Sequence, residues 1–195
     1  MGAKGGHRGR GGCPCGHART SDRGLRRIVA RLKVYADASA LIGLGRIRRL
    51  DLLTLLPNPI YVTARVWEEA ASNPAKPGVG ALLEARNMGL LSVVEEGNSD
   101  AFPELDPGES TVLDAAAAAG AIVAIDERRA RAMIDTNPRL KAAIRRPVGI
   151  IGLVLLAKRL GSVEAVRPLL DELIRQDFRI SPTFYQNALR EAGEL

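Results

Sequence analysis

Short apolar runs alternate with amphipathic segments along most of the chain. Four runs have the length and composition of buried strands, at residues 33–36, 60–62, 90–94 and 121–125, and residues 145–148 are a shorter candidate. Between the runs, apolar residues recur at helical spacing, as Leu41, Leu44 and Ile47 do. Strands that alternate with helices predict a parallel sheet covered by helices on both faces, so we expect an α/β fold.

Capping residues predict where the helices begin and end. Ser39 is a candidate N-cap for the helix after the first strand, and Thr63 for the helix that contains Glu68 and Glu69. Gly120 ends an alanine-rich helix over residues 109–119. Further helices are predicted over residues 50–56, 79–88, 149–160 and 162–176, with others starting at Asp126 and at Ser181-Pro182.

The positive charge of the chain is concentrated near its N-terminus. The formal net charge is +6, but residues 1–33 hold nine Lys or Arg and one Asp, whereas the remainder holds 19 basic and 21 acidic residues. Residues 1–31 are rich in Gly and Arg and have little to bury, which predicts a disordered basic arm followed by one folded domain over residues 32–195. Net charge therefore does not predict nucleic-acid binding by that domain. Three local arginine clusters either hold phosphates or face solvent, at residues 46–49, 128–131 and 145–146.

Both cysteines, Cys13 and Cys15, lie in the arm near His7 and His17. One Cys-x-Cys without a second cysteine pair is a poor match to zinc-site spacing, so zinc binding is not favoured. The absence of cysteine from the predicted domain fits a reducing cytoplasm. The longest apolar run, residues 148–157, is shorter than the ~20 residues of a membrane span, and the N-terminus lacks the apolar core of a signal peptide, so we expect a cytoplasmic protein without membrane contact.

Acidic residues stand where the predicted sheet would bring them together. Asp37 and Asp126 each follow a predicted strand, Glu109 opens the alanine-rich helix, and Glu68-Glu69 lies in the helix after the second strand. The carboxyl ends of parallel strands line one crevice, where sites form in open α/β sheets. Carboxylates gathered there repel each other unless a cation lies between them. The pattern predicts an oxygen-ligand site for a hard divalent metal, and metal-assisted phosphoester chemistry.

Each acid also has a structural interpretation. Asp37 and Asp126 could act as helix N-caps, and Glu109 follows Asp106 at the spacing of a capping box. Glu68 and Glu69 could face water. Their joint position favours the metal site, in which Asp114, about one turn beyond Glu109, is a candidate outer partner.

At these residues the chain resembles the PIN-domain family of metal-dependent nucleases. The resemblance rests on the order and spacing of five segments, which are DASAL (37–41), VWEEA (66–70), GES (108–110), IDERRAR (125–131) and residues 149–161. The chain is most similar to a prokaryotic subgroup, related to the VapC-type ribonuclease toxins, that carries Gly-Glu in place of the usual third aspartate and ends in a stretch like residues 178–182. The likeness covers residues 33–195 and excludes the arm.

The resemblance implies a three-layer α/β/α sandwich on a mostly parallel sheet of four to five strands. It also implies an acidic quartet that binds Mg²⁺ or Mn²⁺ and cuts RNA. In this chain the quartet consists of Asp37, Glu69, Glu109 and Asp126. Ser39 would serve as a hydroxyl ligand or orienting group beside the first acid. Glu69 is preferred to Glu68 because the family's glutamate directly precedes a small or apolar residue, and Glu109 departs from the aspartate of toxin members.

The activity implied is hydrolysis of phosphodiester bonds in single-stranded RNA, with Arg128, Arg129 and Arg131 as candidates for holding phosphates beside the cut. PIN nucleases of this size often act as toxins held by an antitoxin protein, and many dimerise, so an antitoxin and a second copy of the chain are candidate partners. Two alternatives stay open. One is a degenerate domain that binds nucleic acid or protein, and the other is a Mg²⁺-dependent phosphatase, which Ser39 in place of a second aspartate counts against.

Overall fold

A five-stranded parallel sheet forms the centre of the fold. The computed structural model describes residues 1–2 and 32–195. The strands are β1 (Val34–Ala36), β2 (Ile60–Thr63), β3 (Leu91–Val94), β4 (Ile122–Ala124) and β5 (Pro147–Val148). They lie side by side in the order β3-β2-β1-β4-β5. The chain extends the sheet from β1 first in one direction and then in the other, which places a topological switch point at the carboxyl ends of β1 and β4.

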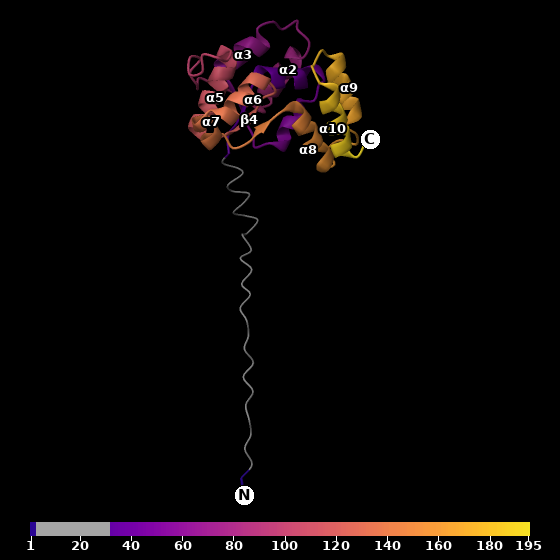
Figure 1. Ribbon diagram of the computed structural model, residues 1–195. Coiled ribbons are helices and arrows are strands. Elements are labelled where there is room, and N and C mark those ends of the chain that lie inside the picture. Colours follow the sequence, from indigo (N-terminus) through magenta and orange to yellow (C-terminus); the bar gives the residue numbers. More distant parts are fainter. Residues whose placement is uncertain (3–31) are drawn as a thin grey trace.

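Helices surround this sheet (Figure 1). They are α2 (Ala38–Arg46), α3 (Ala64–Ala71), α4 (Val79–Asn87), α5 (Pro107–Ala119), α6 (Arg128–Thr136), α7 (Pro138–Ala143), α8 (Ile150–Arg159), α9 (Arg167–Arg175) and α10 (Pro182–Ala192), with a 3₁₀ helix, η1 (Leu50–Leu55). All three residues of β1 are fully buried, although successive side chains of a strand point to opposite faces. Both faces of the sheet are therefore covered, and the predicted α/β sandwich with a parallel sheet is confirmed.

Several predicted helix ends are confirmed because they depend on local contacts. Thr63 Oγ1 accepts a hydrogen bond of 3.4 Å from Val66 N at the start of α3. Ser181 Oγ accepts one of 3.2 Å from Phe184 N at the start of α10. Gly120 ends α5 in the left-handed conformation, with φ of 60°.

Three predicted helix starts are wrong. The N-cap of α2 is Asp37 rather than Ser39, and the N-cap of α6 is Glu127 rather than Asp126. Helix α9 begins at Arg167, five residues after the predicted cap Ser162. In the first two cases the error is one or two residues, because neighbouring residues are equally suited to capping.

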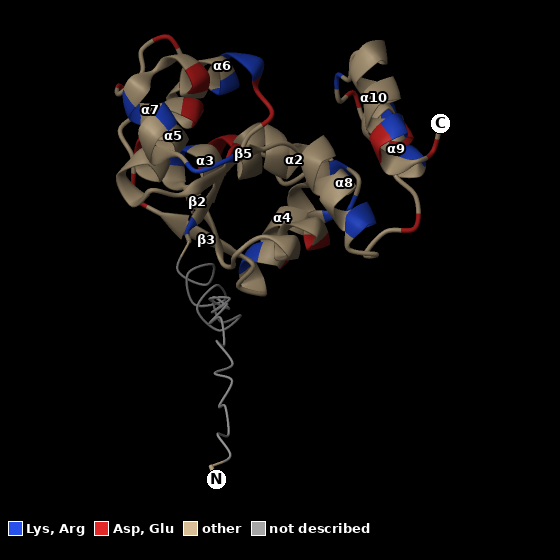
Figure 2. Cartoon of the chain, turned by 60° about the horizontal axis from the view of Figure 1, so that its bottom comes forward, with Lys and Arg blue, Asp and Glu red and all other residues tan. Residues whose placement is uncertain are grey.

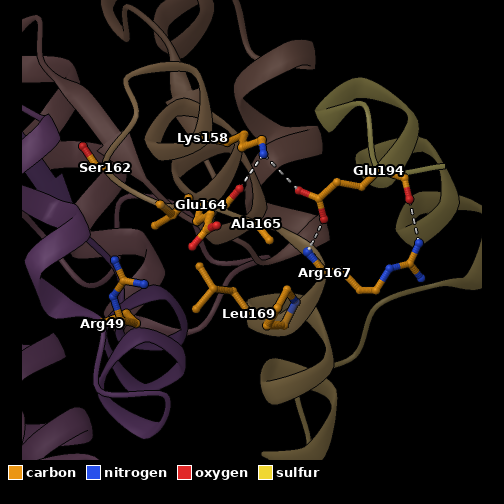
Figure 3. A pocket seen from close by; sticks show the side chains of 10 residues that line it. Arg49, Lys158, Ser162, Glu164, Ala165, Arg167, Leu169 and Glu194 are labelled. Carbon is orange, nitrogen blue, oxygen red and sulfur yellow. Dashed lines mark hydrogen bonds and ion pairs between the residues drawn. The ribbon is translucent and has the colours of Figure 1, made fainter.

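The C-terminus supplies the cap that α9 lacks in its own sequence (Figure 3). The Glu194 carboxylate accepts hydrogen bonds from Val166 N at 2.6 Å and Arg167 N at 2.9 Å. Lys158 Nζ lies 3.6 Å from the same carboxylate. Burial favours the protonated form of Glu194, but these backbone donors and the Lys158 charge outweigh it and lower the pKa. A cavity of about 870 Å³ opens beside this contact, and none of the four predicted acids lines it.

None of the helices in the described part of the chain is both long and apolar enough to cross a membrane. The predicted arm lies almost wholly outside the described residues, as do Cys13, Cys15 and the two histidines. The predictions of disorder and of weak zinc-binding potential therefore stay predictions.

Candidate active site

The first acid, Asp37, lies at the switch point and is almost fully buried, with 4% of its surface exposed. Its backbone N–H donates to Ala124 O at 2.9 Å, which ties the ends of β1 and β4 together. Its Oδ2 accepts hydrogen bonds from Ser39 N at 3.1 Å and from Ser39 Oγ at 2.6 Å. Ser39 thus orients Asp37, and Asp37 caps α2. Burial nevertheless raises the pKa of Asp37, more than these hydrogen bonds lower it.

The fourth acid, Asp126, follows β4 and caps a helix that is distant in sequence. Ile150 N, at the start of α8, donates to both carboxylate oxygens of Asp126, at 3.0 and 3.1 Å. The residue at the N-cap position of α8 is Gly149, which has no side chain to fill this role. Burial raises the pKa of Asp126 to about 6, although the Ile150 N–H and the nearby Arg131 guanidinium act in the opposite direction.

The third acid, Glu109, sits at the start of α5 in the predicted capping box. Its Oε2 accepts a hydrogen bond of 3.2 Å from Asp106 N, so its structural interpretation is confirmed. Only 9% of its surface is exposed. Burial raises its pKa to about 7, helped by the charges of Asp37 and Glu127. A helix cap alone does not require a carboxyl group held in such unfavourable surroundings.

The structure separates the two candidates for the second acid. Glu68 is exposed and pairs with Arg65 on its own helix at 3.5 Å. Glu69 lies against the start of α5, since a Cβ added to Gly108 would come within 2.9 Å of Glu69 Oε2. Partial burial raises the pKa of Glu69, and the charge of Asp37 raises it further. Glu69 therefore faces the other acids, in agreement with the sequence-based preference.

The four acids form one electrostatic group. The Asp37 charge raises the pKa of each of the other three, so the ends of β1 and β4, α3 and α5 converge. Sequence reasoning missed a fifth member, Glu127, whose charge raises the pKa of Asp37 and Glu109. Its position directly after Asp126 was the available signal.

The residues present suit a hard divalent cation by chemistry, because carboxylate oxygens are the ligands that Mg²⁺ and Mn²⁺ favour. Hydrogen bonds and the charges of Arg65 and Arg131 lower the pKa values of individual acids, but the pKa of each of the four stays raised. Within residues 1–2 and 32–195, no three acidic, histidine or cysteine side chains are already placed as a complete metal-binding set. Binding of a shared ion therefore requires rotation of side chains. Glu69 is the one best able to rotate, because it is exposed and long.

A family model described as a PIN domain matches residues 33–194. The chain belongs to the PIN-domain family. Searches of curated proteins and of solved structures gave no match. PIN domains are generally nucleases that use divalent metal ions, so membership supports a hydrolase acting on nucleic acids. The match begins at the first strand and excludes the arm, as the resemblance implied.

The three candidate phosphate-binding arginines and the candidate outer partner, Asp114, differ from one another in exposure and in hydrogen-bond partners. Arg128 and Arg129 are exposed in the first turn of α6, directly after the acidic segment (Figure 2). Arg131 is half-buried and donates to Ile125 O at 3.0 Å, which holds its charge near Asp126. Asp114 accepts hydrogen bonds from Arg139 at 2.8 Å and from Asn98 N at 3.1 Å. These contacts give Asp114 a structural role in joining α5 to α7 and to the loop before α5.

Replacing Gly149 with alanine tests whether Asp126 is held against α8. The new Cβ would lie 2.5 Å from Asp126 Oδ1, so the carboxylate must move and its bond to Ile150 N must weaken. We expect a loss of about 1–2 kcal/mol in the free energy of unfolding, measured with urea. Gly152→Ala is the matched control, because the nearest atom is 3.8 Å away and alanine favours a helix interior by about 0.5–1 kcal/mol. Equal stability of the two variants would contradict this placement of Asp126.

Proposed function

We propose that the protein is a metal-dependent endoribonuclease that hydrolyses phosphodiester bonds in single-stranded RNA. The observation that supports it most strongly is the group of four carboxylates at the switch point, of which Asp37 and Glu109 are buried and each has a raised pKa. Such a group is costly to the fold unless a cation or a substrate-bound ion uses it. Membership of the PIN-domain family gives the reaction class.

In the proposed mechanism, Asp37, Glu69, Glu109 and Asp126 would hold one or two Mg²⁺ or Mn²⁺ ions. A divalent ion in this position supplies the Lewis acid that activates water and offsets charge on the phosphate. In the hydrolysis, the oxygen of a water would bond to phosphorus as the bond to the leaving oxygen breaks, and the proton that the water loses balances the one that the leaving oxygen gains. Ser39 keeps Asp37 in one rotamer, and Arg128 and Arg129 hold the flanking phosphates from the exposed start of α6.

The same resemblance extends the proposal to the biological setting. We propose a cytoplasmic toxin held by an antitoxin protein, with a homodimer as the assembled form. A short reading frame with a DNA-binding segment beside the gene would support this role, and copurification of its product with the chain would test it.

The pair Glu69 and Glu68 offers a test of the function with a built-in control. Glu69→Gln is expected to reduce Mn²⁺-dependent cleavage of a labelled single-stranded RNA by about a hundredfold or more, because a ligand of the ion is lost. Glu68→Gln, one residue away and exposed, is expected to cleave like the wild type. Excess chelator must stop cleavage by all three proteins. Loss of activity in both variants, or in neither, contradicts the assignment.

The alternative function is binding of nucleic acid or protein by a degenerate site. It is favoured by the structural roles that Asp37, Glu109 and Asp126 already have as helix caps. RNA binding that persists in excess chelator, together with no cleavage of RNA, single-stranded DNA or duplex at any metal concentration, would establish this alternative.

A further inference from the structure

A groove leads away from Asp126 along the edge of the sheet. It has a volume of about 670 Å³ and runs beside β5, the last strand in the sheet order, between that strand and helices α8 and α10. A pocket of this size accommodates a ligand rather than a few waters. Asp126 and Gly149 lie at the carboxyl ends of β4 and β5, and Arg146 lies directly before β5, at the other end of that strand. The groove is therefore continuous with the proposed catalytic site.

The groove carries positive charge over an apolar floor. Arg131, Arg146 and Arg159 line it, and Asp126 is the single acid among its lining residues. Arg159 pairs with Glu191 and Arg131 donates to Ile125 O, whereas Arg146 is exposed and no ion pair within the described residues includes it. The floor consists of aliphatic side chains of α8, such as Ile151 and Leu155. Arginines beside an apolar surface suit a ligand that has both phosphates and flat hydrophobic groups.

Phe184 forms the far wall of the groove. It is 54% exposed and is the one aromatic among the strongly exposed large hydrophobic residues of the described chain. Its backbone N–H bonds to Ser181 Oγ at 3.2 Å, so it stands in the capped first turn of α10. An exposed aromatic ring on a fixed helix turn offers a stacking surface for a nucleobase.

We propose that this groove binds an unpaired stretch of nucleic acid next to the bond to be cut, with a base stacked on Phe184 and a phosphate held by Arg146. This inference rests on the proposed function, since the strand on one side of the scissile phosphate must leave past Asp126. It deepens that function by assigning a subsite, Phe184 and Arg146, that would recognise the unpaired strand beside the cut. In a duplex both faces of each base are already stacked, so Phe184 gives a duplex no advantage.

Binding measured in excess chelator tests the groove without cleavage. Fluorescence anisotropy of a short labelled RNA is expected to show that Phe184→Ala weakens binding of the single strand by about 5- to 150-fold, the value of one base stack. Phe184→Trp keeps the affinity, and in a Trp67→Phe background its fluorescence is quenched by the RNA. Ile174→Ala, which removes an exposed side chain of α9 outside the groove, is the control and leaves binding unchanged.

The arginine has its own test. The affinity for single-stranded RNA falls as the salt concentration rises. Arg146→Gln is expected to make the slope of log affinity against log salt shallower by about 0.7, because one phosphate contact is lost. Arg190→Gln, on the same helix as Phe184 but outside the groove, leaves the slope unchanged. Equal slopes for the two variants contradict the role of Arg146.

Four outcomes overturn the proposal for the groove. The first two are equal binding by wild type and Phe184→Ala, and an equal loss for single strand and duplex. The others are displacement of the RNA by an acidic peptide whose binding needs Phe184, and absence of binding to any nucleic acid. If the RNA binds in a way that depends on Phe184 but is not cleaved at any metal concentration, the proposal for the groove stands and the proposed nuclease activity is refuted. If the RNA is cleaved but its affinity does not depend on Phe184, only the proposal for the groove is refuted.

Discussion

Asp37→Asn is expected to reduce metal-dependent RNA cleavage by about a thousandfold or more. Asp37 is the acid whose charge reaches all three others, and it is the most deeply buried of them. Asparagine keeps the shape and the oxygen that accepts from Ser39, but it removes the negative charge that attracts the ion. Initial rates of cleavage of a labelled single-stranded RNA, measured over a range of Mn²⁺ concentrations, give the size of the loss.

The stability of this variant separates a lost ligand from a lost fold. Asparagine caps helices about as well as aspartate, and it avoids the cost of burying a charge. Asp37→Asn is therefore expected to unfold at the same or a higher urea concentration than the wild type. Wild-type cleavage rates in the folded variant would show that Asp37 is only the cap of α2.

The free energy of unfolding without metal is expected to fall as the pH rises from about 4 to about 7. Burial raises the pKa of Glu109 to about 7 and of Asp126 to about 6, above the values of the unfolded chain. In this range the folded state binds more protons than the unfolded state, so each rise in pH favours unfolding. With an allowance for solvent screening, we expect a loss on the order of 2–4 kcal/mol, measured by urea unfolding in chelator.

Glu109→Gln separates the contribution of Glu109 to this pH dependence from the contributions of the other titrating groups. Glu96 and Glu194 have lowered pKa values and act in the opposite direction, because their contribution is lost as the pH falls. The variant keeps both of these residues and removes the group with the pKa of about 7. Its stability must fall less with pH than that of the wild type. If the free energy of unfolding of the wild type instead rises up to neutral pH, in parallel with that of Glu109→Gln, the raised pKa values of Glu109 and Asp126 are contradicted.

The fold was predictable because its signals are local. Each strand is a short apolar run, and helix starts such as Thr63 and Ser181 are set by a side chain that bonds to a backbone N–H three residues away. The start of α9 was not predictable, because its cap is Glu194, 28 residues from Val166 in sequence. When a distant side chain caps a helix, the residues around the helix start contain no capping signal.

The candidate site also has features that the local sequence predicts and others that depend on distant contacts. Asp37 and Asp126 were recognised from their positions after apolar runs, since parallel strands bring such ends together. That Asp126 also caps α8 could not be predicted, because it depends on the pairing of β4 with β5 and on Gly149 allowing the close approach. Glu69 was preferred to Glu68 from the family resemblance, and the position of Glu69 against the start of α5 supplies the physical reason that the sequence lacks.

Calorimetric titration of Mn²⁺ into the wild type and Asp37→Asn, near neutral pH, tests most directly whether the four acids share an ion. The wild type is expected to bind with release of protons, because carboxyl groups with raised pKa values must ionise. Asp37→Asn is expected to bind at least about tenfold more weakly. Equal affinity of the two proteins, or no binding by the wild type, would contradict a metal centre at the switch point of this sheet.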